Sequence, residues 1–175
     1  MQEMMLARAK ALLQSGDVQR VLGWQTGEFV YDVTPAAFET AEELDAKFVY
    51  NDFCGSNLSK YLVKESRKEG RVLVFLKPCD TYSFNQLIKE HRIARESIYV
   101  IGVPCAGKTD GETLKALGLK GILGVKDAGD SFTVETLYGE KTVSKQEALP
   151  ERCRSCKSHK HMVYDELLGE EGEVL

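Results

Sequence analysis

Two short apolar segments, each followed by a proline and a cysteine, place the strongest constraint on how this chain folds. Residues 72–76 (VLVFL) and 98–103 (IYVIGV) are rich in β-branched residues and too short to be helices of a soluble protein, so we expect two buried strands. Residues 83–92, between them, carry Phe84, Leu87 and Ile88 at helical spacing. This stretch therefore predicts a strand–helix–strand unit in which the two strands run parallel.

Both predicted strands end in the same turn, Pro78-Cys79 and Pro104-Cys105. The carboxyl ends of parallel strands point the same way, and open α/β sheets bind their ligands at that edge. Each proline fixes its own φ and removes an amide donor, which stiffens the turn. We therefore expect Cys79 and Cys105 to meet at one edge of the sheet and to form part of a site.

The rest of the chain predicts an α/β domain around this unit. We expect a helix over residues 1–15 closed by Gly16, a hairpin of 18–24 and 28–34 ended by Pro35, a helix at 41–47, and strands at 122–125, 131–137 and 141–143. The predicted fold is a mainly parallel sheet with a βαβ core and a small antiparallel flap. It forms a single domain over residues 1–175, of which 151–175 is a cysteine-bearing tail.

Charge and cysteine content narrow the function classes. A net charge of -4 argues against a nucleic-acid partner, because such proteins usually present a basic face. The sequence contains no apolar run long enough to span a membrane, and its first residues lack the apolar segment of a secretory signal. Five cysteines, an odd number, favour reduced thiols for metal or redox chemistry over disulfides, which points to the cytoplasm.

Cys153 and Cys156 form a C-x-x-C pair with three alternative interpretations: a redox dithiol, half of a zinc site, or half of an iron–sulfur site. A position near the chain end disfavours the thioredoxin-like dithiol. Zinc could take the pair together with His159 or His161. An iron–sulfur cluster accommodates cysteines that come singly from distant loops, because each iron takes one thiolate. Cys79 and Cys105 together with this pair would supply four.

Cys54 is a fifth candidate ligand. It precedes a predicted helix that has Ser56 or Asn57 as N-cap and ends at Gly70. A helix amino terminus lowers the pKa of a thiol and tolerates an anionic group. The alternative for each single cysteine is a small buried hydrophobic residue. The sequence leaves open which of the five cysteines is not a ligand.

Polar residues near the same edge are candidate contacts of a cofactor. Lys77 precedes the Pro78-Cys79 turn, and a lysine beside an anionic centre stabilises its reduced state. Asp80 is best interpreted as the N-cap of the following helix. Asn57 and Ser83 lie on predicted turns at this edge. No G-x-G-x-x-G or P-loop motif is present, and Trp24, Phe29 and Tyr31 are more typical of core or hairpin aromatics than of a flavin platform.

Taken in order, these motifs resemble the beta-subunit family of coenzyme F-420 hydrogenases and dehydrogenases. The chain is most similar to its iron–sulfur branch, which is related to formate dehydrogenase beta subunits and to partners of heterodisulfide reductases. The resemblance covers nearly the whole chain and rests on a cysteine before an Asn-Leu-x-x-Tyr-Leu segment (Cys54, Asn57, Leu58, Tyr61, Leu62), Lys-x-Cys-Asp (Lys77, Cys79, Asp80), Ile-Gly-x-Pro-Cys-x-Gly (Ile101, Gly102, Pro104, Cys105, Gly107) and C-x-x-C (Cys153, Cys156).

The resemblance implies a 4Fe-4S cluster, with Cys54, Cys79, Cys105, Cys153 and Cys156 as the candidate ligands, and often FAD. It further implies an oxidoreductase subunit that passes electrons between a hydride carrier and the clusters of iron–sulfur or flavoprotein partner subunits. The alternative function, from another class, is a non-catalytic module stabilised by zinc or by a cluster, which serves structure or redox sensing.

Overall fold

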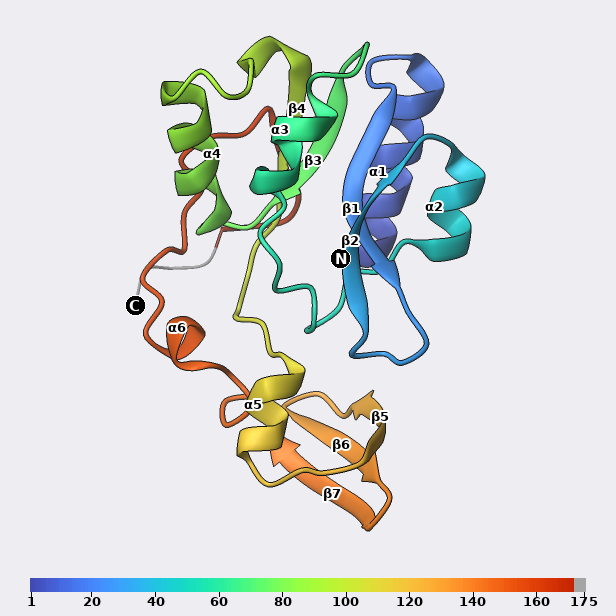
Figure 1. The fold of residues 1–175 in the computed structure, drawn as a ribbon, viewed down its shortest axis with the longest axis vertical. Coiled ribbons are helices and arrows are strands. Elements are labelled where there is room, and N and C mark those ends of the chain that lie inside the picture. Colours follow the sequence, from blue (N-terminus) through green and yellow to red (C-terminus); the bar gives the residue numbers. More distant parts are fainter. Residues whose placement is uncertain (172–175) are drawn as a thin grey trace.

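The computed structural model describes residues 1–171, so residues 172–175, the end of the predicted tail, lie outside the described part. It contains two sheets (Figure 1). The larger has the strand order β2-β1-β3-β4-β8, with β1 Arg20–Thr26, β2 Val33–Phe38, β3 Val72–Leu76, β4 Ile98–Gly102 and β8 Glu166–Leu167. The smaller has the order β5-β6-β7, with β5 Ile122–Asp127, β6 Ser131–Thr136 and β7 Gly139–Ser144.

The predicted parallel pair lies at the centre of the larger sheet. β3 and β4 pair in parallel from Val72 opposite Ile98 to Leu76 opposite Gly102. Every residue of β3 is buried, as expected for a strand covered on both faces. The connecting helix α4 (Asp80–Lys89) begins three residues before the predicted start. The α/β fold class, a mainly parallel sheet with an antiparallel flap, is confirmed.

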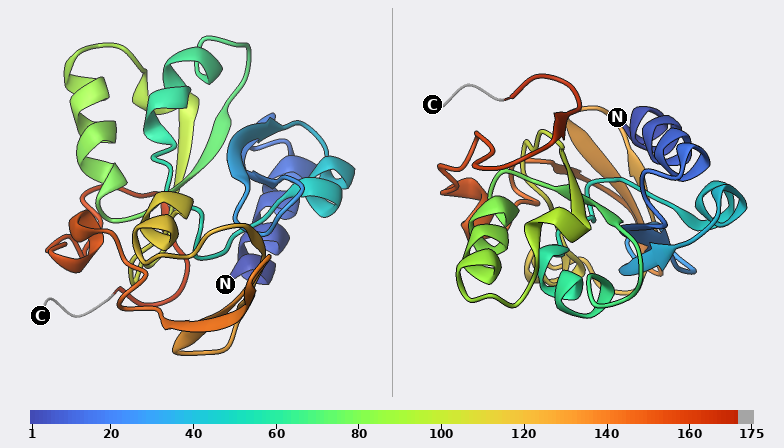
Figure 2. Two further views of the ribbon diagram at one scale, coloured as in Figure 1. Left: turned by 60° about the horizontal axis from the view of Figure 1, so that its bottom comes forward. Right: turned by 90° about the horizontal axis from the view of Figure 1, so that it is seen from above.

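Helices cover both faces of the larger sheet. Figure 2 shows α1 (Gln2–Ser15) and α2 (Ala41–Lys47) on one side and α3 (Leu62–Glu65) and α4 on the other. The prediction that Gly16 closes α1 is confirmed, because its φ of 79° is the left-handed conformation that glycine adopts at little cost. Helix α2 has its predicted bounds and is capped by Thr40, whose hydroxyl accepts a hydrogen bond from the backbone N–H of Glu43.

The prediction that Pro35 ends the second strand was wrong. Pro35 lies inside β2, opposite Trp24 of the antiparallel neighbour β1. β2 is an edge strand, so it can contain a residue without an N–H when that position faces away from the ladder. The strand also starts later than expected, because the turn between β1 and β2 is closed by a 2.7 Å hydrogen bond from the Gly27 N–H to the Asp32 carbonyl.

The single helix predicted between residues 56 and 70 is replaced by two short pieces, a 3₁₀ turn at Ser59–Tyr61 and α3. The buried Arg20 guanidinium donates to the carbonyls of Glu65, Lys68 and Glu69 at 2.6–3.4 Å. These carbonyls are therefore satisfied by a side chain instead of by further helical turns, and α3 ends at Glu65.

The smaller sheet lies beyond the carboxyl ends of β3 and β4 (Figure 1). It follows α5 (Gly111–Ala116) and has its own apolar cluster around Leu114, Phe132 and Val134. Tyr31 and Phe53 from the first part of the chain pack against that cluster, and the Tyr31 hydroxyl donates to the Ile122 carbonyl at 2.9 Å. Among the described residues, no helix has the length and apolar content to cross a membrane.

Candidate functional site

The two Pro-Cys turns lie side by side at the carboxyl edge of the parallel pair. Cys79 follows β3 and Cys105 follows β4, and these strands are hydrogen-bonded neighbours. The first turn is fixed from both sides of Cys79, because the Thr81 hydroxyl donates to the Pro78 carbonyl at 2.6 Å and the Lys77 N–H donates to the Asp80 carboxylate at 3.2 Å. The topology thus presents both thiols at the edge where the sequence predicted them.

The tail brings the C-x-x-C pair back to this edge. Cys153 lies in the short helix α6 (Glu151–Arg154), and Cys156 follows it. Arg152, the residue directly before Cys153, forms a 2.9 Å ion pair with Asp110, the N-cap of α5. After the pair, β8 adds to the sheet beside β4. The pair is therefore held between two anchored segments of the tail.

After the C-x-x-C pair, His161 connects the tail to the sheet before β8 does. It is buried, and its Nε2 lies 2.9 Å from the Leu76 carbonyl at the end of β3, while Nδ1 lies 3.1 Å from a Glu171 carboxylate oxygen. Gly102 leaves room for this ring, since a Cβ at that position would lie 2.9 Å from the His161 Cδ2 atom. Both ring nitrogens are engaged, so His161 is not placed as a metal ligand in this conformation.

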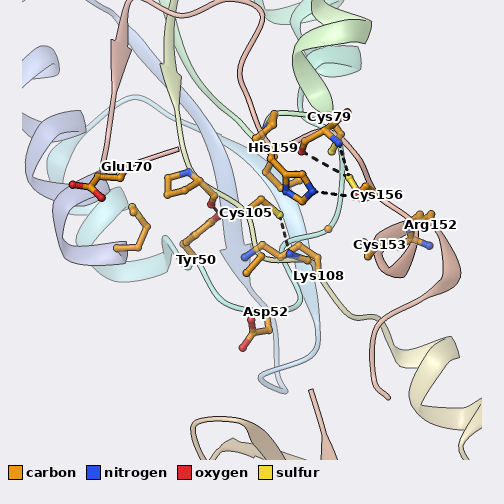
Figure 3. Close-up of a pocket in the computed structure, with 18 residues that line it drawn as sticks. Tyr50, Asp52, Cys79, Cys105, Lys108, Arg152, Cys153, Cys156, His159 and Glu170 are labelled. Carbon is orange, nitrogen blue, oxygen red and sulfur yellow. Dashed lines mark hydrogen bonds between the residues drawn. The ribbon is translucent and has the colours of Figure 1, made fainter. Parts of the chain in front are cut away.

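A cavity of about 670 Å³ occupies the space between the sheet edge and the tail. Four of the five cysteines line it (Figure 3): Cys79, Cys105, Cys153 and Cys156. The structure thus brings thiols from three separate segments to one cavity. All five cysteines are free of disulfides.

Of the four cysteines that line the cavity, Cys79 is exposed and Cys105, Cys153 and Cys156 are half-buried. Backbone N–H groups donate to two of them, Gly107 to Cys105 and Ser158 to Cys156, each at 3.4 Å. Although Cys79 is exposed, surrounding protein atoms partly desolvate its thiol and raise its pKa to about 12, with a further contribution from the negative charge of Asp80; burial also raises the pKa of Cys105. As free thiols both are protonated at neutral pH, so an incoming metal would displace their protons.

Cationic side chains line the same cavity: Lys77, Lys108 and Arg152. Lys77 is buried and pairs with Asp80 at 2.8 Å. Lys108 is also buried, and its ammonium donates to the Asn51 carbonyl at 2.9 Å. Two carboxylates, Asp52 and Glu170, also line the cavity, and Asp52 is paired with Lys145 at 3.1 Å. Since the cations on the wall outnumber the carboxylates, the charge distribution favours an anionic occupant.

Cys54 does not line this cavity. It is fully buried in the main apolar cluster, where its sulfur accepts from the Asn51 N–H at 3.3 Å. The expectation that a helix amino terminus lowers its pKa was wrong, because the following segment is a 3₁₀ turn that begins only at Ser59, and burial raises the pKa. Its surroundings match the alternative of a small buried hydrophobic residue.

Of the four polar residues proposed as cofactor contacts, only one lines the cavity. Lys77 lines the cavity, and Asp80 serves as its ion-pair partner. The prediction that the Asp80 side chain caps α4 was wrong, since Cys79 occupies the N-cap position and the carboxylate turns back to Lys77. Asn57 and Ser83 bond to each other at 2.6 Å, and Asn57 also accepts from the Ser59 N–H, so these two tie the 3₁₀ turn to α4 rather than line the cavity.

Sequence reasoning missed several residues of the cavity wall, notably Tyr50, Lys108 and Arg152. Two of them had a sequence cue that was not used. Lys108 lies three residues after Cys105, and Arg152 directly precedes Cys153. Tyr50 had none, because only the tertiary fold places the segment after α2 beside the Cys105 turn.

The arrangement of the cysteines can be compared with what a zinc ion and a 4Fe-4S cluster each require. Within residues 1–171, no three His, Cys, Asp or Glu side chains are arranged to hold a single metal ion. A mononuclear zinc site requires its ligands to converge on one ion at about 2.3 Å from each sulfur. A 4Fe-4S cluster separates its thiolates more widely, because each binds a different iron atom. Four thiols spread around one cavity therefore suit a cluster better than a zinc ion.

Proteins of known identity share sequence similarity with this chain. No protein-family model matches it. The beta subunit of F420-dependent formate dehydrogenase 1 from Methanococcus maripaludis is 30% identical over 104 residues, which is 59% of this chain and 27% of the relative. The beta subunit of F420-dependent formate dehydrogenase from Methanocaldococcus jannaschii is 28% identical over 162 residues, which is 85% of this chain and 42% of the relative.

The fold agrees with the sequence matches. A chain in the structure of the F420-reducing [NiFe] hydrogenase complex from Methanosarcina barkeri superposes with a TM-score of 0.67 over 89% of this chain, at 16% identity. In sequence, the chain is thus similar to beta subunits of F420-dependent formate dehydrogenases, and in fold it is similar to a chain of an F420-reducing hydrogenase complex. The resemblance inferred from the cysteine motifs is thereby confirmed. The chain spans less than half the length of the two formate dehydrogenase subunits and 59% of the hydrogenase chain.

Proposed function

We propose that this chain binds a 4Fe-4S cluster through Cys79, Cys105, Cys153 and Cys156 and transfers electrons within a redox complex. The observation that carries the proposal is the convergence of these four thiols, from two strand ends and the tail, on one cavity. Four thiolates are the usual ligand set of such a cluster. The relatives are named as beta subunits of F420-dependent formate dehydrogenases, which supports a role in an oxidoreductase assembly.

The residues of the chain have separate tasks in this proposal. The four cysteines bind the irons, and the Gly107 and Ser158 N–H groups donate to two of the sulfurs, which stabilises their anionic form. Lys77 adds positive charge beside the Cys79 turn. The bound cluster itself would supply one-electron exchange.

Cys54 is excluded from the proposed ligand set, because it packs in the main core and does not reach the cavity. We therefore propose Cys54 as the one cysteine of the five that is not a ligand. Its thiol packs in the core, accepts a hydrogen bond from the Asn51 N–H and donates one to the Val49 carbonyl.

FAD stays an implication of the resemblance and is not part of the proposed mechanism. Trp24 is fully buried, and Phe29 and Tyr31 stack on each other with centroids 5.2 Å apart. Among the described residues, these aromatic rings do not form an open platform for a flavin, and no step is derived through it. The predicted partners, iron–sulfur or flavoprotein subunits, are proposed from the names of the relatives, and a cytoplasmic site of action is proposed from the free cysteines.

The test is anaerobic reconstitution of the purified chain with iron and sulfide. We expect a brown protein with broad visible absorption, about four irons and four sulfides per chain, and reversible bleaching by dithionite. A colourless protein that binds one zinc would contradict the proposal and support the structural module. A cluster that cannot be reduced without loss of iron would also favour a structural role over electron transfer.

A further inference from the structure

Lys108 is a buried cation that faces the four-cysteine cavity. Lys108 lies three residues after Cys105 in the sequence, and the residue is 7% exposed. The ammonium donates one hydrogen bond, to the Asn51 carbonyl at 2.9 Å, and lies 4.0 Å from the centroid of the Tyr50 ring. Figure 3 shows Lys108 beside Cys105 and Tyr50 on the wall of the cavity.

Within residues 1–171, this ammonium has no ion-pair partner among the carboxylates. Asp52 on the same wall is engaged instead by Lys145 at 3.1 Å. The other buried lysine of the cavity differs in this respect, because Lys77 is neutralised by Asp80 at 2.8 Å. Among the described residues, Lys108 is therefore a buried positive charge on the cavity wall that no carboxylate compensates.

Such a charge is costly in a protein that lacks a counter-ion. Removing an ammonium from water without a compensating anion destabilises the folded state, and burial lowers the pKa of Lys108 accordingly. The Tyr50 ring and the Asn51 carbonyl offset only part of that cost, since a cation–π contact and one neutral acceptor are weaker than an ion pair. An anion in the cavity would complete the compensation.

We propose that Lys108 is the charge-compensating residue for the anionic cluster held by the four cysteines, and that it favours the cluster's reduced state. This inference rests on the proposed function. A cluster with four thiolate ligands is anionic, and each added electron increases its negative charge. A nearby fixed ammonium therefore stabilises the reduced form more than the oxidised form and makes the midpoint potential more positive.

The first measurement needs no cluster. We compare the urea unfolding of metal-free wild type, Lys108→Met and Lys77→Met. Lys108→Met removes an unpaired buried charge, so we expect it to be at least as stable as wild type. Lys77→Met leaves the buried Asp80 carboxylate without its partner, so its unfolding midpoint should fall clearly below wild type. A Lys108→Met protein destabilised as much as Lys77→Met would show that Lys108 is a structural residue and would overturn the inference.

The second measurement is a redox titration of the reconstituted proteins followed by electron paramagnetic resonance. In Lys108→Met we expect the equilibrium constant for reduction of the cluster to fall at least tenfold. For a one-electron couple, this lowers the midpoint potential by about 59 mV. Lys108→Arg, which keeps the charge, should restore most of the wild-type potential. If Lys108→Met fails to assemble a cluster but Lys108→Arg assembles one, the requirement for charge is likewise supported.

An unchanged potential in Lys108→Met, or loss of the cluster from both variants, would contradict the role of Lys108. Failure of the wild type to bind iron and sulfide would instead contradict the proposed function, and the unfolding comparison would still decide whether Lys108 carries an uncompensated charge.

Discussion

The turn that presents Cys79 is fixed by a buried ion pair between two residues on either side of it. Lys77 Nζ lies 2.8 Å from Asp80 Oδ2, and the two side chains are 3% and 4% exposed. The same carboxylate oxygen accepts the Lys77 N–H. Asp80 therefore acts on the thiol by shaping its turn and by balancing the charge of Lys77.

Replacement of Asp80 should be costly because it leaves the Lys77 ammonium buried and unpaired. We predict that Asp80→Asn lowers the free energy of unfolding by about 3–5 kcal/mol, measured by urea denaturation of the metal-free chain. The matched control is Glu112→Gln, which breaks the exposed pair between Glu112 and Lys115 and should cost less than about 1 kcal/mol. Equal, small effects of the two substitutions would argue against the buried pair as a determinant of the turn.

Asp110 links the cysteine tail to α5 in a pH-dependent way. Burial raises the pKa of its carboxyl, but hydrogen bonds from Thr113 and Arg152 outweigh burial and hold the pKa below the usual value. A lowered folded-state pKa means that this contribution to stability is fully present above the unfolded-state pKa and is lost as the pH falls through the folded-state value. The window is therefore the acid range below about pH 4.

The predicted variant is Asp110→Asn, which keeps an oxygen acceptor for the Thr113 N–H but removes the charge. Its thermal midpoint should fall less than that of wild type between pH 5 and pH 3. Glu140→Gln, an exposed position on β7, serves as the control and should follow the wild-type pH profile. Parallel pH profiles for Asp110→Asn and wild type would contradict the assignment.

At the level of elements, the parts that the sequence predicted well are those with a strong local pattern. β3 and β4 are short apolar runs with turns at both ends, and α2 has both a capping threonine and a helical charge pattern. The failures have tertiary causes. Pro35 is tolerated because β2 lies at the edge of the sheet, and α3 is cut short by the Arg20 side chain, which is 45 residues away from Glu65 in sequence.

The contact between the tail and the sheet depends on a glycine in β4. A Cβ at Gly102 would lie 2.9 Å from both His161 Cδ2 and Leu167 Cδ1. We predict that Gly102→Ala displaces residues 161–168 and accelerates hydrogen exchange at the amides of Asp165 and Leu168, which bond to Val100 and Gly102. Gly111→Ala, where a Cβ meets no atom within 4 Å, is the control. Unchanged exchange in Gly102→Ala would show that the tail is held by other contacts.

Across the whole molecule, the candidate site lies where three independent parts of the chain meet. The main sheet supplies Cys79 and Cys105 at the ends of β3 and β4. Helix α5, which precedes the smaller sheet, has Asp110 as its N-cap, and Arg152 of the tail pairs with it. The tail supplies the C-x-x-C pair. Local patterns could predict that Cys79 and Cys105 share an edge. They could not predict that Cys54 turns into the core or that Lys108 faces the cavity, because those orientations depend on how the parts pack.

The account rests on the identity of the four thiols that meet at the cavity. The most direct measurement is the iron and sulfide content, after anaerobic reconstitution, of five matched variants in which each cysteine in turn is replaced by alanine. We predict that the alanine variants of Cys79, Cys105, Cys153 and Cys156 lose most of the cluster, whereas Cys54→Ala retains wild-type iron and sulfide. Retention of a full cluster by any of the four, or its loss from a folded Cys54→Ala protein, would contradict the account.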